Sequence, residues 1–166
     1  MTDPLIQLPR AKGLAVLFIF IAVFTDQYAK LWGRQHISPG ETLFFLNDII
    51  HVTVVENRGG FLGVVNNLPE NIRFFLLYIC VAILLVCCIL YLFSRKSQSQ
   101  RYALPLSWVV GGGLSNLLDR IINSGGVYDF ISIGFGSFRT GIFNLADLFI
   151  LAGSFLIGFS MLHRND

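Results

Sequence analysis

The chain has 166 residues, of which 54% are hydrophobic and only 13% are charged, and its mean hydropathy is +0.67. Soluble domains carry about 25% charged residues, so this composition excludes an ordinary soluble domain and indicates one compact membrane domain. The small formal net charge of +2, without basic runs interleaved with aromatic residues, argues against nucleic acid as a partner.

Four apolar segments are long enough to cross a bilayer, which takes about 20 residues. We therefore predict an α-helical integral membrane protein with four transmembrane helices, in which residues 1–166 form a single domain. The spans are predicted at about residues 13–32, 74–93, 102–118 and 140–162. Basic residues precede the first span as in a signal peptide, but no small-residue cleavage motif follows, so we interpret it as a retained helix.

The charges of the connecting segments predict the orientation. An even number of spans places both termini and the loop 94–101 on one side, which then has six basic and two acidic residues against six and eight on the other. The positive-inside tendency predicts that both termini are cytoplasmic and that the acidic side faces outward.

Two segments are predicted on the outer side. In the loop 33–73, "ETLFFLNDIIHVTVVENRGGFLGVV" alternates and is rich in Val, Phe, Ile and Thr, which is typical of strands. We therefore predict a small extracytoplasmic β-structure between the first and second helices, lying on the membrane surface. "PENIR", from Pro69, resembles a helix start. The second outer segment, 119–139, contains "FISIGFGSF", which indicates a re-entrant or surface strand.

Ionisable residues within membrane spans are rare and are functional candidates by default. Asp26 and Lys30 share a helix face at i, i+4, which predicts a local ion pair that anchors the first helix at its outer end. Asn116, Asp119 and Arg120 share a face at the end of the third span, where an Asp119–Arg120 ion pair is a structural interpretation. The run "GGG" before them allows a neighbouring helix to approach closely.

Asp129 and Asp147 are harder to explain as structural residues. Asp147 is the eighth residue of the predicted run 140–162, which places it about 10 Å inside the apolar segment. Asn144, three residues earlier, shares its face and is a candidate for orienting the carboxylate. Short connections bring the outer ends of the third and fourth spans together, so the two aspartates are expected to meet near the outer surface.

Two facing carboxylates in a low-dielectric place share one proton, because like charges close together do not both ionise. One then acts as a general base toward water and the other as a general acid, as in aspartic peptidases. A small proton-coupled transporter uses the same groups, but the inward halves of the spans are almost purely apolar. A Mg²⁺-dependent lipid phosphotransferase, which needs clustered acidic ligands, and a non-catalytic scaffold are further alternatives.

Five strings resemble those of the lipoprotein signal peptidase family, also called signal peptidase II, in order and approximate spacing. They are "TDQYAK" (25–30), "VENRGG" (55–60), "GGGLSNLLDR" (111–120), "VYDF" (127–130) and "FNLAD" (143–147). The resemblance covers essentially the whole chain. It implies a membrane aspartic endopeptidase that removes signal peptides from diacylglyceryl-modified prolipoproteins by cleaving on the amino side of the lipidated cysteine.

By this resemblance, Asp129 and Asp147 match the catalytic dyad. The positions that match substrate-binding or active-site support are Asn57, Gly59, Asn116, Arg120, Asn144 and Ala146, and those that match structural polar positions are Asp26, Lys30 and Asp119. The resemblance implies no metal or organic cofactor. It also implies a monomer in the bacterial cytoplasmic (inner) membrane, in contact with membrane lipids and sensitive to globomycin-type peptide inhibitors.

The chain departs from the family pattern at Ser115, where glycine is common, and at Phe61 and Leu62, where a small residue and then Phe are usual. Neither departure is expected to touch a carboxylate. We expect them to affect the shape of the substrate groove and inhibitor sensitivity more than the chemistry. The loop 57–63 is predicted to close over the site as a lid.

Overall fold

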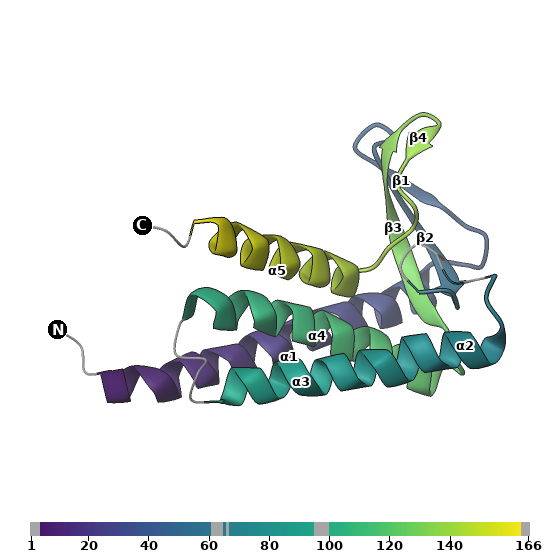
Figure 1. Ribbon diagram of the computed structural model, residues 1–166. Helices are drawn as coiled ribbons and strands as arrows, with labels where there is room; N and C mark the ends of the chain where they lie inside the picture. The colour runs from purple at the N-terminus through teal and green to yellow at the C-terminus, as the bar shows by residue number, and fades with distance from the viewer. Residues whose placement is uncertain (1–3, 61–64, 66, 95–99, 164–166) are drawn as a thin grey trace.

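Helices packed side by side and a small sheet at one end of them make up the computed structural model, which describes residues 4–60, 65, 67–94 and 100–163. Both ends of the chain lie at the end of the bundle opposite the sheet (Figure 1). This separates the molecule into a sheet end and a terminal end.

The first two helical segments extend beyond the predicted spans. Helix α1 runs over Pro4–His36. The next helix is continuous from α2 (Glu70–Phe74) through a π-helical stretch (Phe75–Cys80) into α3 (Val81–Phe93). It begins directly after Pro69, as "PENIR" predicted. Proline is favoured at a helix start because its fixed φ angle suits the helix and it has no N–H group that needs a hydrogen-bond partner.

Helix α4 covers Gln100–Ile122 and α5 covers Leu145–Leu162. The predicted start of the last span at residue 140 is wrong. Thr140 and Phe143 donate their backbone N–H groups to Ile133 and Ile131, so this apolar stretch is extended and lies against a strand. Within the described residues, three helical stretches are long and apolar enough to cross a membrane: Lys12–His36, Glu70–Phe93 and Leu145–Leu162.

The sheet has four antiparallel strands in the order β1 (Leu43–Phe45), β2 (Ile50–Asn57), β3 (Val127–Phe135) and β4 (Phe138–Arg139). The prediction that the β-structure belongs to the loop 33–73 is therefore only half right. Strands β3 and β4 come from the segment between α4 and α5, and the pairing of β2 with β3 sets Val55 opposite Asp129. The two segments are far apart in the sequence and meet only in the folded protein. The strand pattern of either segment alone therefore does not reveal that they pair.

Helix α4 lies at the centre of the bundle, and the three glycines 111–113 explain how. A Cβ atom on the first would lie 2.7 Å from Cβ of Ala22 in α1, and one on the third would lie 2.7 Å from Leu85 in α3. A Cβ atom on the middle glycine would collide with the carbonyl oxygen of Ala146 in α5. Each glycine thus allows a different helix to pack closely against α4, whereas the sequence predicted one close neighbour.

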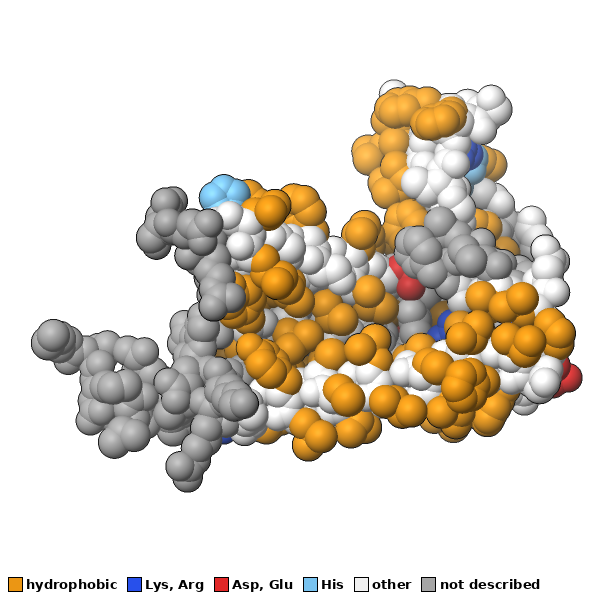
Figure 2. Space-filling model, viewed as in Figure 1, with side chains coloured by type: hydrophobic (Ala, Val, Ile, Leu, Met, Phe, Trp, Pro, Cys, Tyr) orange, Lys and Arg blue, Asp and Glu red, His pale blue; other side chains and the backbone are white. Residues whose placement is uncertain are grey.

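Large apolar side chains cover the outer surfaces of the helices, as expected where lipid is the solvent. Phe20, Ile83 and Phe155 are 63%, 59% and 69% exposed. Figure 2 shows this apolar surface along the bundle, with acidic and basic side chains visible in a recess where the sheet meets the helices. The buried charged side chains, which are Asp26, Lys30, Asp119, Arg120 and Asp129, lie towards the sheet end.

Candidate functional site

Asp129 lies on β3, buried between the sheet and the helices, with 2% of its surface exposed. Its Oδ2 accepts a hydrogen bond from Asn57 Nδ2 at 2.8 Å and its Oδ1 accepts one from Asn144 Nδ2 at 2.6 Å. Burial raises the pKa of Asp129 to about 6, although the two amide donors act in the opposite direction. The carboxyl group therefore changes its charge near neutral pH.

Asp147 lies in the first turn of α5, so the predicted position about 10 Å inside the apolar run is wrong. Asn144 is the N-cap of the helix. Its side chain accepts from Asp147 N at 3.0 Å, and its backbone N–H donates to Asp147 Oδ2 at 3.3 Å, which makes a capping box. Asn116 Nδ2 donates to Asp147 Oδ1 at 2.9 Å. Helix capping, not a shared helix face, sets the orientation of this carboxylate.

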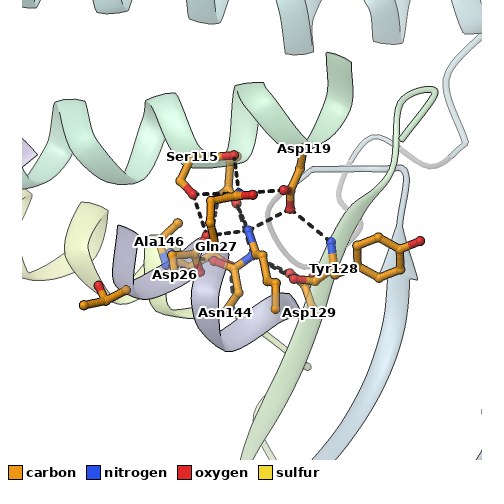
Figure 3. Close-up of polar contacts among 12 residues, drawn as sticks. Asp26, Gln27, Ser115, Asp119, Tyr128, Asp129, Asn144 and Ala146 are labelled. Carbon is orange, nitrogen blue, oxygen red and sulfur yellow. Dashed lines mark hydrogen bonds and ion pairs between the residues drawn. The ribbon is translucent and has the colours of Figure 1, made fainter. Parts of the chain in front are cut away.

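Asn144 joins the two aspartates. It is fully buried, its side-chain amide donates to Asp129, and its backbone N–H donates to Asp147. The close-up in Figure 3 shows Asn144 beside Asp129 at the base of α5. The two carboxylates, which were expected to meet near the outer ends of the third and fourth spans, are thus linked through one asparagine.

A second buried cluster lies next to the first. Lys30 Nζ is 2.6 Å from Asp26 Oδ2, which confirms the predicted ion pair, but the pair is buried instead of lying at the membrane surface. The same Nζ is 2.8 Å from Asp119 Oδ2 and donates to Asn116 Oδ1 at 3.0 Å. The predicted Asp119–Arg120 ion pair is therefore wrong, because among the described residues Asp119 pairs with Lys30 of another helix, which it shares with Asp26.

This lysine cluster positions α5. Asp26 Oδ1 accepts the backbone N–H of Ala146 at 3.0 Å, which satisfies one of the free N–H groups of the first helical turn (Figure 3). Asp26 Oδ2 also accepts from the hydroxyl of Ser115 at 2.7 Å. The departure at Ser115 therefore falls in this cluster and not in a groove wall, and it does contact a carboxylate.

Sequence reasoning missed Gln27. Its Nε2 donates to Asp119 Oδ1 at 2.7 Å and to Ser115 Oγ at 3.0 Å, so it links the lysine cluster to α4 (Figure 3). The signal was present, since Gln27 is a polar residue next to Asp26 in an apolar span. Its partners lie about 90 residues away in the sequence, as the separation of 92 from Asp119 shows, and no local pattern identifies them.

A cleft of about 460 Å³ opens beside Asp147. Asn116, Arg120 and Gly60 lie at its polar end, and Leu77, Val81, Gly113, Ile150, Leu151 and Ser154 complete its lining. Arg120 is only 7% exposed; it donates to the backbone oxygen of Asn116 at 3.1 Å, and its Nε has no acceptor among the described residues. A buried cation without a carboxylate partner at the rim of a cleft is suited to bind an oxygen of a ligand.

The turn after β2 supports both the cleft and Asp129. Gly59 donates its N–H to Asn57 Oδ1 at 2.9 Å, and Asn57 Nδ2 donates to the carbonyl oxygen of Gly60 at 2.7 Å. Phe61, Leu62 and Gly63, the last three residues of the predicted lid 57–63, lie outside the described residues. Within the described part of the chain, no three His, Cys, Asp or Glu side chains group as metal ligands do.

Comparison with known proteins gives one consistent result. The sequence model of the family described as Signal peptidase (SPase) II matches residues 18–163. The chain is similar to the lipoprotein signal peptidases of Caldanaerobacter subterraneus (29% identity, covering 92% of this chain and 98% of the relative), Borrelia hermsii (31%, 84% and 84%) and Caldicellulosiruptor bescii (38%, 72% and 72%). It also resembles a solved bacterial membrane enzyme, with a TM-score of 0.78 at 25% identity, covering 90% of this chain and 88% of that one.

Proposed function

The chain belongs to the signal peptidase II family and is a protease that acts on the signal peptides of lipoproteins, and from this premise we propose that Asp129 and Asp147 are its catalytic dyad. The substrate is a diacylglyceryl-modified prolipoprotein, and the bond cleaved lies on the amino side of the lipidated cysteine. The runner-up, a proton-coupled transporter, is not favoured by the family match.

The arrangement around Asn144 carries this proposal. One asparagine donates to both carboxylates, so they are held at one place. Among the described residues neither forms an ion pair, and their partners are neutral amides. A carboxylate that is not fixed by a cation exchanges a proton readily, and a pKa of about 6 for Asp129 leaves both protonation states populated near neutral pH.

The proposed chemistry follows because Asp129 and Asp147 share one proton. The ionised member of the pair removes a proton from a water molecule, which attacks the scissile carbonyl carbon. The protonated member donates to the departing amine. A coupled pair titrates as a unit, so the proton belongs to the pair and not to one named aspartate. The amides of Asn57, Asn116 and Asn144 hold the carboxylates in place throughout.

The cleft beside Asp147 supplies the substrate site. Its apolar wall, including Val81, Ile150 and Leu151, suits a lipid-modified segment that arrives from the bilayer, where burial of acyl chains contributes affinity. Arg120 donates to a carbonyl oxygen of the substrate, which gives its Nε the acceptor that the described residues do not provide.

The sheet supports four spans with the site on the outer side. Strand β2 pairs with β3, so both lie on the same side of the membrane. The chain leaves that side through Glu70–Phe93, which is apolar enough to cross, and must return through α4 to reach β3. Both termini then lie on the other side, and the excess of basic residues there favours the cytoplasm for that side.

Cleavage of a purified diacylglyceryl-modified prolipoprotein, followed by gel shift, tests the dyad. Asp129→Asn and Asp147→Asn are each expected to reduce kcat/KM by at least about 100-fold, the contribution typical of a general acid or base. Asp48→Asn is the matched control, because that aspartate lies exposed in the turn between β1 and β2 (55% exposed). EDTA is expected to leave all rates unchanged. Full activity in either folded dyad variant would contradict the assignment.

A further inference from the structure

A second, smaller cavity lies at the sheet end of the helix Glu70–Phe93, and Leu77 lines both it and the proposed catalytic cleft. Its volume is about 100 Å³, which is the space of about three water molecules. Arg58, Glu70, Arg73 and Ser124 line it. This is room for one small polar group and not for a peptide.

Arg73 is the unusual member of this cavity. Its Nε is buried and has no acceptor, and no described residue forms a hydrogen bond or an ion pair with its guanidinium. Glu70 lies three residues earlier on the same helix and lines the same cavity, yet the two side chains are not paired. A guanidinium with free donors binds the oxygens of a phosphate in a planar, two-point geometry.

The second arginine points to the same ligand. The Nε of Arg58 donates a hydrogen bond to Glu56 Oε1 at 2.8 Å, which leaves the terminal nitrogens of the guanidinium available to a ligand. The four charged residues Arg58, Arg73, Glu56 and Glu70 sum to zero formal charge. The cavity thus presents two arginines together with the unpaired carboxylate of Glu70. It therefore complements a ligand that carries both a negative and a positive charge.

The position of the cavity relative to the lipid-facing surface identifies the source of that group. Phe74 and Phe75, directly after Arg73, are 52% and 55% exposed and belong to the stretch that is apolar enough to cross a membrane. The charged residues thus lie at the end of a span, at the depth of phospholipid headgroups. Basic pockets at such depths are suited to lipid phosphates.

We propose that this cavity binds the headgroup of a phospholipid that carries a phosphate and a primary amine. The phosphate oxygens accept from Arg73 and Arg58, and the ammonium donates to Glu70. The acyl chains run along the exposed face of Phe74 and Phe75. This site is separate from the proposed catalytic cleft and does not depend on the chemistry there.

Native mass spectrometry of the full chain, released from detergent with equimolar phosphatidylethanolamine, phosphatidylglycerol and phosphatidylcholine, tests the site. The wild type is expected to retain phosphatidylethanolamine preferentially. Arg73→Gln is expected to lower that retention about fivefold, the effect of one arginine–phosphate contact near a membrane surface. Arg73→Lys keeps the charge without the planar fork and is expected to recover only part of it.

Two further variants separate the proposal from general lipid adhesion. Glu70→Gln removes the partner of the amine and is expected to shift the preference toward phosphatidylglycerol. Arg34→Gln is the matched control, because Arg34 is exposed at the same end of the bundle but lies over the Tyr128 ring at 4.2 Å, in a different hollow. Its retention is expected to equal that of the wild type.

Equal retention of the three lipids by the wild type, or unchanged retention in Arg73→Gln, would overturn the proposal. A separate arm adds inorganic phosphate without lipid. Binding of phosphate that is lost in Arg73→Gln, together with no lipid preference, would instead identify a site for the free anion and reject the lipid headgroup.

Discussion

Asp129 differs from an ordinary aspartate because it is almost completely buried and binds no cation among the described residues. Its pKa in the folded protein is about 6, against 3.8 for the free side chain, so the folded state binds a proton more tightly than the unfolded state. The unfolding free energy therefore rises as the pH falls from above 6 toward 4. In Asp129→Asn this part of the pH dependence is expected to disappear, which thermal unfolding in detergent between pH 4 and 8 measures. An unchanged slope would show that Asp129 is not the titrating group.

Asn57 tunes this carboxyl group. Its hydrogen bond to Asp129 Oδ2 lowers the pKa by favouring the charged form. Removal of the amide in Asn57→Ala is therefore expected to shift the limb of the pH–activity profile near pH 6 to higher pH, with a loss of kcat at neutral pH. The profile of kcat/KM against pH measures this shift. Asn71→Ala, at an exposed position on α2, serves as the control and is expected to keep the wild-type profile.

The beginning of α5 is the element on which the site depends most. Asp26 of α1 accepts the N–H of Ala146, and Lys30 neutralises Asp26. Asp26→Ala removes both contacts while Lys30 keeps Asp119 as its partner, and it leaves the N–H of Ala146 and the hydroxyl of Ser115 without this acceptor, which costs about 1–3 kcal/mol for each buried donor left unsatisfied. We expect a lower unfolding temperature and a reduced kcat, since Asp147 follows Ala146 directly.

Asp26→Asn separates the two contacts, because its carbonyl oxygen still accepts from Ala146 while the charge on Lys30 loses one partner. It is expected to keep more activity than Asp26→Ala at equal folded fraction. Thr25→Ala is the control, because the Thr25 hydroxyl binds only backbone oxygens of its own helix. Equal kcat in both Asp26 variants would argue that this contact does not position Asp147.

Sequence alone could predict part of this element and not the rest. Hydropathy identifies the apolar run that contains α5, and the spacing of Asn144 and Asp147 is visible in "FNLAD". The true start at Leu145 depends on Phe143 pairing with Ile131 in β3, and an apolar stretch gives no sign of whether it is strand or helix. Similarly, the i, i+4 rule predicts Asp26–Lys30, but the contact of Lys30 with Asp119 depends on the packing of two helices.

At the scale of the whole molecule, α4 organises the other helices through its glycines. Gly112→Ala places a Cβ against the carbonyl oxygen of Ala146, which is backbone and has little freedom to move. We expect a displaced α5, a destabilisation of about 1–3 kcal/mol as for overpacked cores, and a loss of activity. Unfolding temperature and cleavage rate measure both effects. Gly158→Ala, in α5 with open space around its Cβ position, is expected to behave as the wild type.

The long apolar stretches and the order of the five motifs made the family and the general membrane architecture predictable from the sequence. The sheet was not predictable as a whole, because its central pairing joins β2 and β3 across two helices. The three glycines 111–113 were recognised as a packing motif, yet their contacts with three separate helices depend on the complete bundle.

The pairing of β2 with β3 also sets the timing of biogenesis. Asn57 and Asp129 are 72 residues apart, a length that a ribosome takes roughly 4–14 seconds to translate. During this interval the nascent chain has β2 with an unpaired edge, and neither Asp129 nor Asp147 has been made. With the proposed dyad incomplete, the growing chain is expected to have no peptidase activity until its own insertion is nearly complete, and the unpaired edge of β2 is the place where mispairing with another strand is expected.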